Sequence, residues 1–321
     1  MKNKTSKDFK GKKILVTGGA GFIGGHLVST LLKSQAEVCV VDINILPKSL
    51  FALESLSKKV QLKNVDVREK EKILSLFKEN NFDYAFHLAA VASVLSSYDD
   101  PSLTFETNIM GTVNMLEAAR ENKNVKGIIV ASSDKAYGTT NKAYTEDSPL
   151  KGQDPFGVSK SSADLICQAY YKTYGTPIVI TRFSNVYGEG DLHFDRLIPE
   201  ICRAIVKNEE FKVRSDGTFI RDYIYIKDAV NGYMTLLNNV ERIKGEVYNF
   251  SSPDSLSVLE VIKKVNSLID KKLIYKIVNN SKNEIPYQHL DDSKVKRLGW
   301  KPNYDLTSTL KSIMKWYRSV L

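Results

Sequence analysis

The sequence of 321 residues contains no apolar run close to the ~18–20 residues that a membrane-crossing helix needs. It has only 18 glycines and 9 prolines, with no internal repeat and no low-complexity linker. This composition excludes a collagen-like or wholly disordered chain. Cysteine is scarce, since Cys39, Cys167 and Cys202 are odd in number, far apart and set in apolar segments. We therefore expect reduced, buried thiols in a cytoplasmic protein.

The four histidines are scattered, and no His, Cys and Asp spacing typical of a metal site occurs. A Gly-x-Ser-x-Gly elbow of the hydrolase type is also missing. The net charge is +9, partly from a lysine-rich start over residues 1–13. No apolar segment follows it, so we expect a solvated tail and no secretory signal. Without interleaved aromatic residues it does not favour nucleic acid, and we expect neither a nucleic-acid nor a membrane partner.

The first half of the chain alternates short β-branched runs with longer amphipathic segments. This rhythm predicts an α/β protein, a Rossmann-type doubly wound parallel sheet with helices on both faces. The expected strands are residues 14–17, 38–42, 60–67, 84–88, 125–131 and 177–182, and the expected helices are residues 22–32, 70–78, 103–120 and 156–174.

After Arg182 the rhythm breaks. Residues 185–195 are expected to form a loop, and residues 246–250 a strand that returns to the first sheet. Helices are expected at residues 197–206, 227–237, 257–269 and 306–317, with a short strand at residues 212–213. We predict a cofactor domain of residues 1–181 plus 222–253, and a smaller mixed α/β substrate domain of residues 182–221 plus 254–321.

A glycine-rich turn follows the first strand, with the sequence Thr-Gly-Gly-Ala-Gly-Phe-Ile-Gly over residues 17–24. Gly18 permits a tight turn, Gly21 lets the backbone approach a pyrophosphate, and Gly24 lets helix and strand pack closely. The helix that begins near Phe22 and Ile23 directs free N–H groups toward such a phosphate. A strand, these glycines and a helix in this order predict dinucleotide binding.

Asp42 ends the second strand, 18 residues after Gly24. A carboxylate there can accept hydrogen bonds from a ribose diol and would repel a 2′-phosphate, so NAD is favoured over NADP. Asp66 follows the third strand, where it can lie near the adenine or cap the helix that begins at Lys70. The sequence leaves these two roles of Asp66 open.

With these and further motifs, the chain resembles the extended short-chain dehydrogenase/reductase family, the NAD-dependent nucleotide-sugar epimerases and dehydratases. The shared motifs span nearly the whole chain, from the glycine turn through Asp66-Val67-Arg68 to Leu-Gly-Trp-Lys-Pro over residues 298–302. The resemblance implies that the cofactor contacts also include Val67, Leu88, Ala89, Ala90, Asn108, Ser132 and Lys160.

The family's signature Tyr-x-x-x-Lys falls on Phe156 and Lys160, which share one face of a helix. In the family, the lysine binds the nicotinamide ribose and lowers the pKa of the tyrosine, whose phenolate takes the proton of the sugar hydroxyl. Phenylalanine has no proton to exchange. Either the tyrosine was exchanged by engineering, which the intact neighbouring motifs favour, or the protein naturally lacks this base. We expect NAD and sugar nucleotide to bind and to turn over poorly.

Ser133, Asp134 and Lys135 follow the fifth strand. The resemblance implies that Ser133 polarises the 4-oxygen of the sugar, Asp134 is the general acid and Lys135 the base of a 4,6-dehydratase of the CDP-glucose type. A solvent-facing charged dipeptide is the structural alternative. The other functions that stay open are a nucleotide-sugar 4-epimerase or 4-dehydrogenase, and a catalytically silent NAD-binding protein.

The substrate implied is a nucleoside-diphosphate sugar, with CDP, GDP and UDP all open. Asn185 and Arg221 match the family's pyrophosphate contacts, and Arg196 can assist them. Phe211 and Val213 are expected to flank the base, or to pack as ordinary edge-strand residues. The family often pairs two long helices per subunit into a four-helix interface, which predicts a homodimer formed through residues 103–120 and 161–174.

Overall fold

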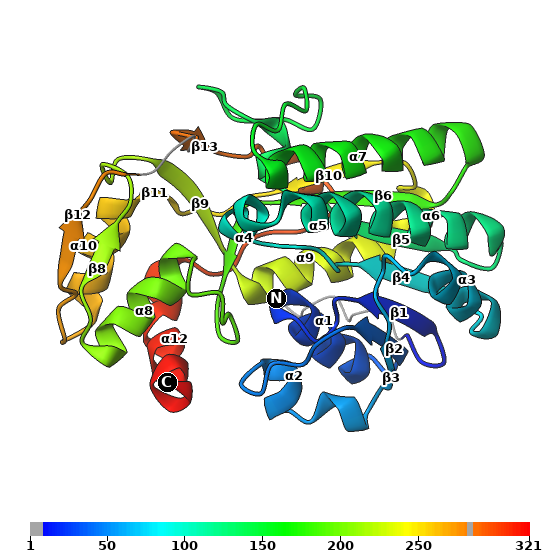
Figure 1. Cartoon of the computed structure of the whole chain (residues 1–321), viewed down its shortest axis with the longest axis horizontal. Helices are drawn as coiled ribbons and strands as arrows, with labels where there is room; N and C mark the ends of the chain where they lie inside the picture. The colour runs from blue at the N-terminus through cyan, green and yellow to red at the C-terminus, as the bar shows by residue number, and fades with distance from the viewer. Residues whose placement is uncertain (1–8, 281–284) are drawn as a thin grey trace.

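A computed structural model describes residues 9–280 and 285–321 of the chain (Figure 1). Most of the lysine-rich tail, residues 1–8, lies outside the described part. The centre is a seven-stranded parallel sheet in the order β10-β6-β5-β4-β1-β2-β3, which confirms the predicted fold class. Its strands are β1 (Lys13–Thr17), β2 (Glu37–Asp42), β3 (Gln61–Asn64), β4 (Tyr84–His87), β5 (Gly127–Ala131), β6 (Ile178–Phe183) and β10 (Val247–Phe250).

Helices cover both faces of this sheet, because neighbouring side chains of each strand point to opposite sides. On β1, Ile14 and Val16 join the largest hydrophobic cluster, with α1 and α9, whereas Leu15 joins a second cluster, with α3, α6 and α7. The helices are α1 (Phe22–Lys33), α3 (Lys70–Glu79), α6 (Gly111–Glu121), α7 (Pro155–Tyr174) and α9 (Ile226–Asn239).

A smaller α/β part lies at the left of Figure 1. In it, β9 pairs with β7, β11 and β13, while β8 pairs with β12. The strands are β7 (Asn185–Tyr187), β8 (Phe211–Val213), β9 (Ile220–Tyr225), β11 (Ser255–Ser257), β12 (Tyr275–Ile277) and β13 (Tyr287–Gln288), and the helices are α8 (Leu197–Lys207), α10 (Val258–Leu268) and α12 (Leu306–Val320). The short helix α11 (Ser293–Lys296) packs beside β10 of the central sheet.

Three of the elements predicted from the sequence differ in detail from those in the structure. The loop expected over residues 185–195 begins with the strand β7. The strand expected over residues 60–67 is limited to β3, and residues 65–67 leave the sheet. The long helix expected over residues 103–120 consists of α5 (Pro101–Phe105), a π-helical turn η2 (Glu106–Met110) and α6. The wider turn of η2 interrupts the regular 3.6-residue period of the α-helix.

Three short α-helices, α2 (Leu50–Leu53), α4 (Val94–Asp99) and α11, were not predicted. None of the helices in the described ranges is long and apolar enough to cross a membrane. Cys39, Cys167 and Cys202 are all free and buried, as expected.

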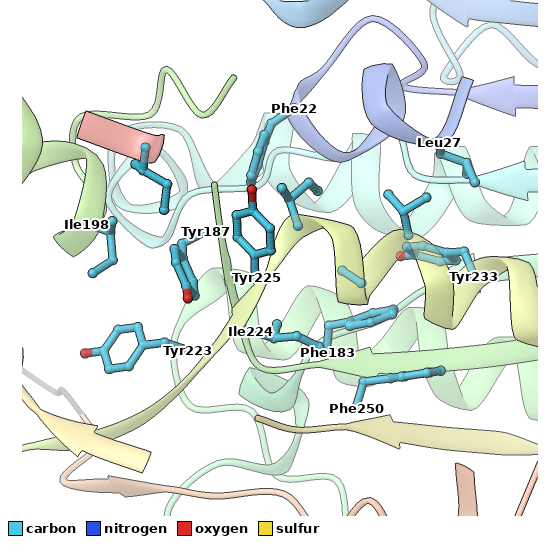
Figure 2. Packing of buried hydrophobic residues seen from close by; sticks show 14 of the residues in the cluster. Phe22, Leu27, Phe183, Tyr187, Ile198, Tyr223, Ile224, Tyr225, Tyr233 and Phe250 are labelled. Carbon is cyan, nitrogen blue, oxygen red and sulfur yellow. The ribbon is translucent and has the colours of Figure 1, made fainter. Parts of the chain in front are cut away.

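Aromatic side chains join the sheet to α9. Figure 2 shows Phe183 of β6 beside Phe250 of β10, and their rings stack with centroids 4.2 Å apart. Tyr233 of α9 packs against Phe183 with centroids 4.9 Å apart. Tyr187 of β7 and Tyr225 of β9 continue this layer toward the smaller part. The β6–β7 and β9–α9 junctions are therefore fixed by one continuous core.

A buried ion pair ties α7 to the sheet. Arg182 of β6 donates to both carboxylate oxygens of Asp164 of α7, from Nε at 2.8 Å and from Nη2 at 2.9 Å. Each residue is 1% exposed. Arg182 Nη1 also donates to the hydroxyl of Tyr137 at 2.6 Å, and that hydroxyl donates to Asn249 of β10 at 2.7 Å. The paired carboxylate and phenol keep the pKa of Arg182 above its ordinary value although burial opposes the charge.

Replacing Asp164 with Ala should leave the guanidinium of Arg182 buried without its counter-ion. We expect the free energy of unfolding to fall by about 3–5 kcal/mol, the cost typical of breaking a buried pair. Chemical denaturation followed by circular dichroism measures it. The control is Lys296→Ala, which breaks the half-exposed Lys296–Asp292 pair and should cost less than about 1 kcal/mol. Equal losses in the two variants would contradict the structural role given to the buried pair.

Candidate active site

A cavity of about 920 Å³ runs along the carboxyl ends of β1, β2, β4 and β5 and continues into the smaller part. Ligands of open α/β sheets bind at this edge. Nearly all of the residues singled out in the sequence line it: Gly18, Gly21, Phe22, Ile23, Gly24, Asp42, Asp66, Val67, Leu88, Ala89, Ala90, Ser132, Ser133, Asp134, Lys135, Phe156, Lys160, Asn185, Arg196, Phe211, Val213 and Arg221.

Asn108 is the exception, since it lies behind the cavity wall and is 2% exposed. Its amide accepts from Val91 N at 2.8 Å and donates to Val91 O at 3.1 Å and to Ser159 Oγ at 2.9 Å. Asn108 thus connects η2 to α7 and to the loop after β4. In this structure it holds the wall of the cavity in place.

The glycine turn depends on missing side chains. Gly18 has φ +68°, the left-handed conformation that glycine adopts without strain. A Cβ on Gly24 would lie 2.0 Å from the carbonyl oxygen of Gly18, so only glycine lets α1 start this close to β1. No side chain caps α1 at Gly21. The first N–H groups of α1 therefore face the cavity with no capping side chain over them.

The two acidic residues near this turn are held by different partners. Asp42 accepts from Ala20 N at 2.9 Å and from Ile43 N at 2.8 Å, which fastens the glycine turn to the end of β2. Burial raises the pKa of Asp42, although these backbone donors oppose the shift. Asp66 accepts from Arg68, with Nη2 at 2.7 Å, and it does not cap α3, whose N-cap residue is Glu69.

These residues fit a dinucleotide. The glycines leave a cradle that a Cβ would fill, and α1 presents its N-terminus to it. Ser132 Oγ, at the end of β5, is buried with no hydrogen-bond partner among the described residues. A buried hydroxyl of this kind favours a ligand donor or acceptor at that position. Residues 9–280 and 285–321 contain no group of three or more His, Cys, Asp or Glu residues that could hold a metal ion.

The turn after β5 forms the short helix η3 (Asp134–Tyr137). Ser133 Oγ accepts from Lys135 N at 3.2 Å and donates to Asp134 Oδ1 at 3.0 Å. Lys135 Nζ lies 3.3 Å from both carboxylate oxygens of Asp134 and 2.6 Å from Gln288 Oε1. The Asp134 side chain is 4% exposed and that of Lys135 16%, so the pair is no solvent-facing dipeptide. Burial lowers the pKa of Lys135, and the charge of Asp134 opposes the shift.

Phe156 and Lys160 lie at the start of α7, where Pro155 is the first residue and Asp154 caps the helix by accepting from Gly157 N at 2.9 Å. Lys160 Nζ donates to Ala131 O at 2.9 Å and lies 5.9 Å from the centre of the Phe156 ring. Burial lowers the pKa of Lys160 to about 8. The two side chains therefore share the cavity as the i, i+4 spacing predicts.

The smaller part supplies the basic side of the cavity. Arg221 comes from β9, and Asn185 of β7 donates to Asp222 O at 3.3 Å. Arg196 donates to Ala92 O at 3.0 Å, so it bridges the two parts of the molecule. Phe211 and Val213 line the cavity and also belong to the hydrophobic core.

Three further cavity residues escaped the sequence analysis. Ser184 follows β6, and its Oγ has no partner among the described residues. Arg214 follows the short strand β8 and donates to Glu200 at 2.7 Å. Gln288 belongs to the two-residue strand β13. Ser184 and Arg214 are next in the chain to the candidate residues Asn185 and Val213, and this is the one signal in the sequence that could have found them. No local pattern in the sequence marks Gln288.

Comparisons with known proteins agree with this geometry. Residues 14–251 match the model of the "NAD dependent epimerase/dehydratase family". The chain is 32% identical to the CDP-glucose 4,6-dehydratase of Salmonella typhimurium strain LT2, over 97% of this chain and 92% of that protein.

Two solved structures share the fold. The UDP-glucuronic acid 4-epimerase from Bacillus cereus, in complex with UDP-glucuronic acid and NAD, has a TM-score of 0.89 at 29% identity, covering 96% of this chain and 100% of that one. DesIV, the dTDP-glucose 4,6-dehydratase from Streptomyces venezuelae with NAD bound, has a TM-score of 0.86 at 28% identity, covering 96% and 97%. With a family match that spans most of its length and such relatives over nearly all of it, the chain belongs to the NAD-dependent epimerase/dehydratase family.

Proposed function

We propose that this chain is built as an NAD-dependent nucleotide-sugar 4,6-dehydratase, with Phe156 limiting its turnover. The observation that carries the proposal is the buried Asp134–Lys135 pair, which lines the cavity directly after Ser133. The likeness to the CDP-glucose dehydratase of Salmonella typhimurium supports the same reaction. The substrate proposed is a nucleoside-diphosphate glucose, with CDP as the first nucleotide to test.

In this proposal, each of the residues around the sugar has a separate role in the reaction. Ser133 donates toward the 4-oxygen, and a ketone at C4 makes the C5 proton acidic. Lys135 then takes that proton while Asp134 protonates the leaving 6-hydroxyl. The lowered pKa of Lys135 favours the neutral amine that this role requires. When bound in the cradle, NAD supplies the redox chemistry, accepting a hydride and returning it.

Two groups of residues hold the ligands in this proposal. Lys160 holds the nicotinamide ribose, and the glycine turn holds the pyrophosphate of the dinucleotide. Arg221, Arg196 and Asn185 bind the diphosphate of the sugar nucleotide, because guanidinium groups match phosphate oxygens in geometry and charge. Phe156 fills the place where the family carries its tyrosine and has no phenolate oxygen to accept the proton of the 4-hydroxyl.

A 4-epimerase is the second candidate, favoured by the likeness to the Bacillus cereus enzyme. It would use the same oxidation at C4 without eliminating water. A buried acid and amine beside Ser133 are needed for the elimination and not for a simple return of hydride. The two candidates therefore differ in whether water is lost.

Restoring the phenol should restore turnover. We expect Phe156→Tyr to raise the rate of CDP-glucose conversion by about 100- to 10,000-fold, the contribution typical of a positioned acid/base. Steady-state assays with CDP-, UDP- and GDP-glucose measure it, and Phe156→Leu is the control without a hydroxyl. No gain in any assay would defeat the proposal and favour a catalytically silent NAD-binding protein.

The amine of Lys135 should be needed for the loss of water and not for oxidation at C4. In the Phe156→Tyr background, Lys135→Met should lower formation of the 4-keto-6-deoxy product by about 100-fold or more. Reduced NAD should then accumulate on the enzyme, visible by its absorbance, while mass spectrometry follows the product. Exposed Lys142→Met is the control. A Lys135→Met variant with undiminished product formation would rule out this assignment.

We also propose a cytoplasmic homodimer. Three free, buried cysteines support a reducing compartment. Val158 and Leu165, seven residues apart on one face of α7, are 38% and 54% exposed, and Met110 of the adjoining η2 is 51% exposed. Apolar side chains gathered on neighbouring helices favour a protein partner, here a second copy of the chain.

A charge on this helical face should separate the subunits. We expect the unchanged protein to sediment as a dimer at micromolar concentration and Leu165→Glu as a monomer, because a buried carboxylate without a partner is costly. Leu53→Glu is the matched control, since Leu53 is 55% exposed on α2, outside this face. Sedimentation velocity would refute the dimer if the unchanged chain ran as a monomer.

A further inference from the structure

Gln288 is a buried polar residue in the cavity wall that the proposed mechanism does not use. It is 1% exposed and lines the cavity from β13. Its Oε1 accepts from Lys135 Nζ at 2.6 Å, while its Nε2 has no hydrogen-bond partner among the described residues. Buried amide donors are rarely left unpaired, because an unmade hydrogen bond costs free energy.

The surroundings of Gln288 place it on the sugar side of the cavity. In the parallel pairing of β13 with β9, Gln288 lies opposite Arg221. Through Lys135 it also adjoins Asp134, the proposed acid. Lys135 has acceptors on two sides, Asp134 and Gln288, and a neutral amine has two N–H groups and one lone pair. With both N–H groups donated to these acceptors, the lone pair is left free to take a proton.

We propose that Gln288 is both a positioning and a specificity-determining residue. Its Oε1 positions Lys135 by accepting a hydrogen bond from it, and its Nε2 donates a hydrogen bond to an oxygen of the sugar. The inference rests on the proposed function, because it presumes a sugar beside Asp134 and Lys135. A neutral amide donor suits a hydroxyl or carbonyl oxygen, whereas the diphosphate is matched by the arginine side chains nearby.

Phe156 makes the first test direct, since slow turnover allows binding to be measured with a true substrate. Calorimetry compares the tightest-binding of CDP-, UDP- and GDP-glucose with its own nucleoside diphosphate. Gln288→Met, which keeps the length and apolar packing of the side chain, should weaken sugar-nucleotide binding about tenfold, as expected for one lost hydrogen bond. Binding of the nucleoside diphosphate should not change.

Gln288→Glu guards against a folding defect, because it keeps the size and an acceptor for Lys135 but removes the donor. It should show the same selective loss. Gln153→Leu is the control, since Gln153 is exposed, contacts Thr139 and does not line the cavity. Equal weakening of both ligands, or of neither, would overturn the sugar contact. If the unchanged chain binds dinucleotide but no sugar nucleotide, the proposed function itself fails and this inference with it.

The second test concerns Lys135 and needs no tyrosine. In deuterium oxide, Lys135 can take the C5 proton of a 4-keto-6-deoxy sugar nucleotide onto Nζ. The C–H electron pair passes into the C4 carbonyl as an enolate, and a solvent deuteron returns to C5. Nuclear magnetic resonance follows the exchange. Gln288→Met should slow it about 10- to 100-fold through misplacement of the amine. An unchanged rate would overturn the positioning role.

Discussion

The site depends on the ion pair between Arg182 and Asp164. It joins α7, which carries Phe156 and Lys160, to β6, and through the Tyr137 hydroxyl it reaches η3, which carries Asp134 and Lys135. Because a guanidinium has a rigid, planar fork of donors, it fixes directions as well as distances. Two cavity-lining segments that are more than twenty residues apart in the chain are therefore held in one geometry by a single buried cation.

The same network extends to the substrate side. Tyr137 donates to Asn249 of β10, whose amide donates to Tyr144 O at 3.0 Å. Tyr144 N donates to His289 O at 2.9 Å, directly beside Gln288. The position of Gln288 against Lys135 is thus set from two directions, by the pairing of β13 with β9 and by the segment around Tyr144. These hydrogen bonds favour one arrangement of Gln288 and Lys135.

The sequence predicts the parts of the fold that rest on local periodicity. Strands such as β1 and β2, and helices such as α1 and α7, carry long, regular patterns, and the glycine turn needs no tertiary information beyond its strand and helix. β7, β11 and β13 are two or three residues long and exist because of distant partners, so no local period marks them. Charged Arg221 and Asp222 interrupt the apolar run of β9. Gln288 could not be predicted as a site residue for the same reason, because its contact in the site is Lys135, 153 positions away in the chain.

Phe156 shows how separate the demands of packing and chemistry are. Its ring is 7% exposed in the cavity wall, and Lys160 is satisfied by Ala131 O without any phenol oxygen. The fold therefore does not need a hydroxyl at this position, and in the proposed reaction only the transfer of the 4-hydroxyl proton would need it. In the proposed reaction, oxidation at C4 comes first, so the missing hydroxyl would slow the whole sequence, whereas Asp134, Lys135 and their neighbour Gln288 would act only in the steps after that oxidation. In this proposal, the type of reaction depends on the side chains after β5 and on β13, and the rate of the first step depends on the oxygen atom that Phe156 lacks.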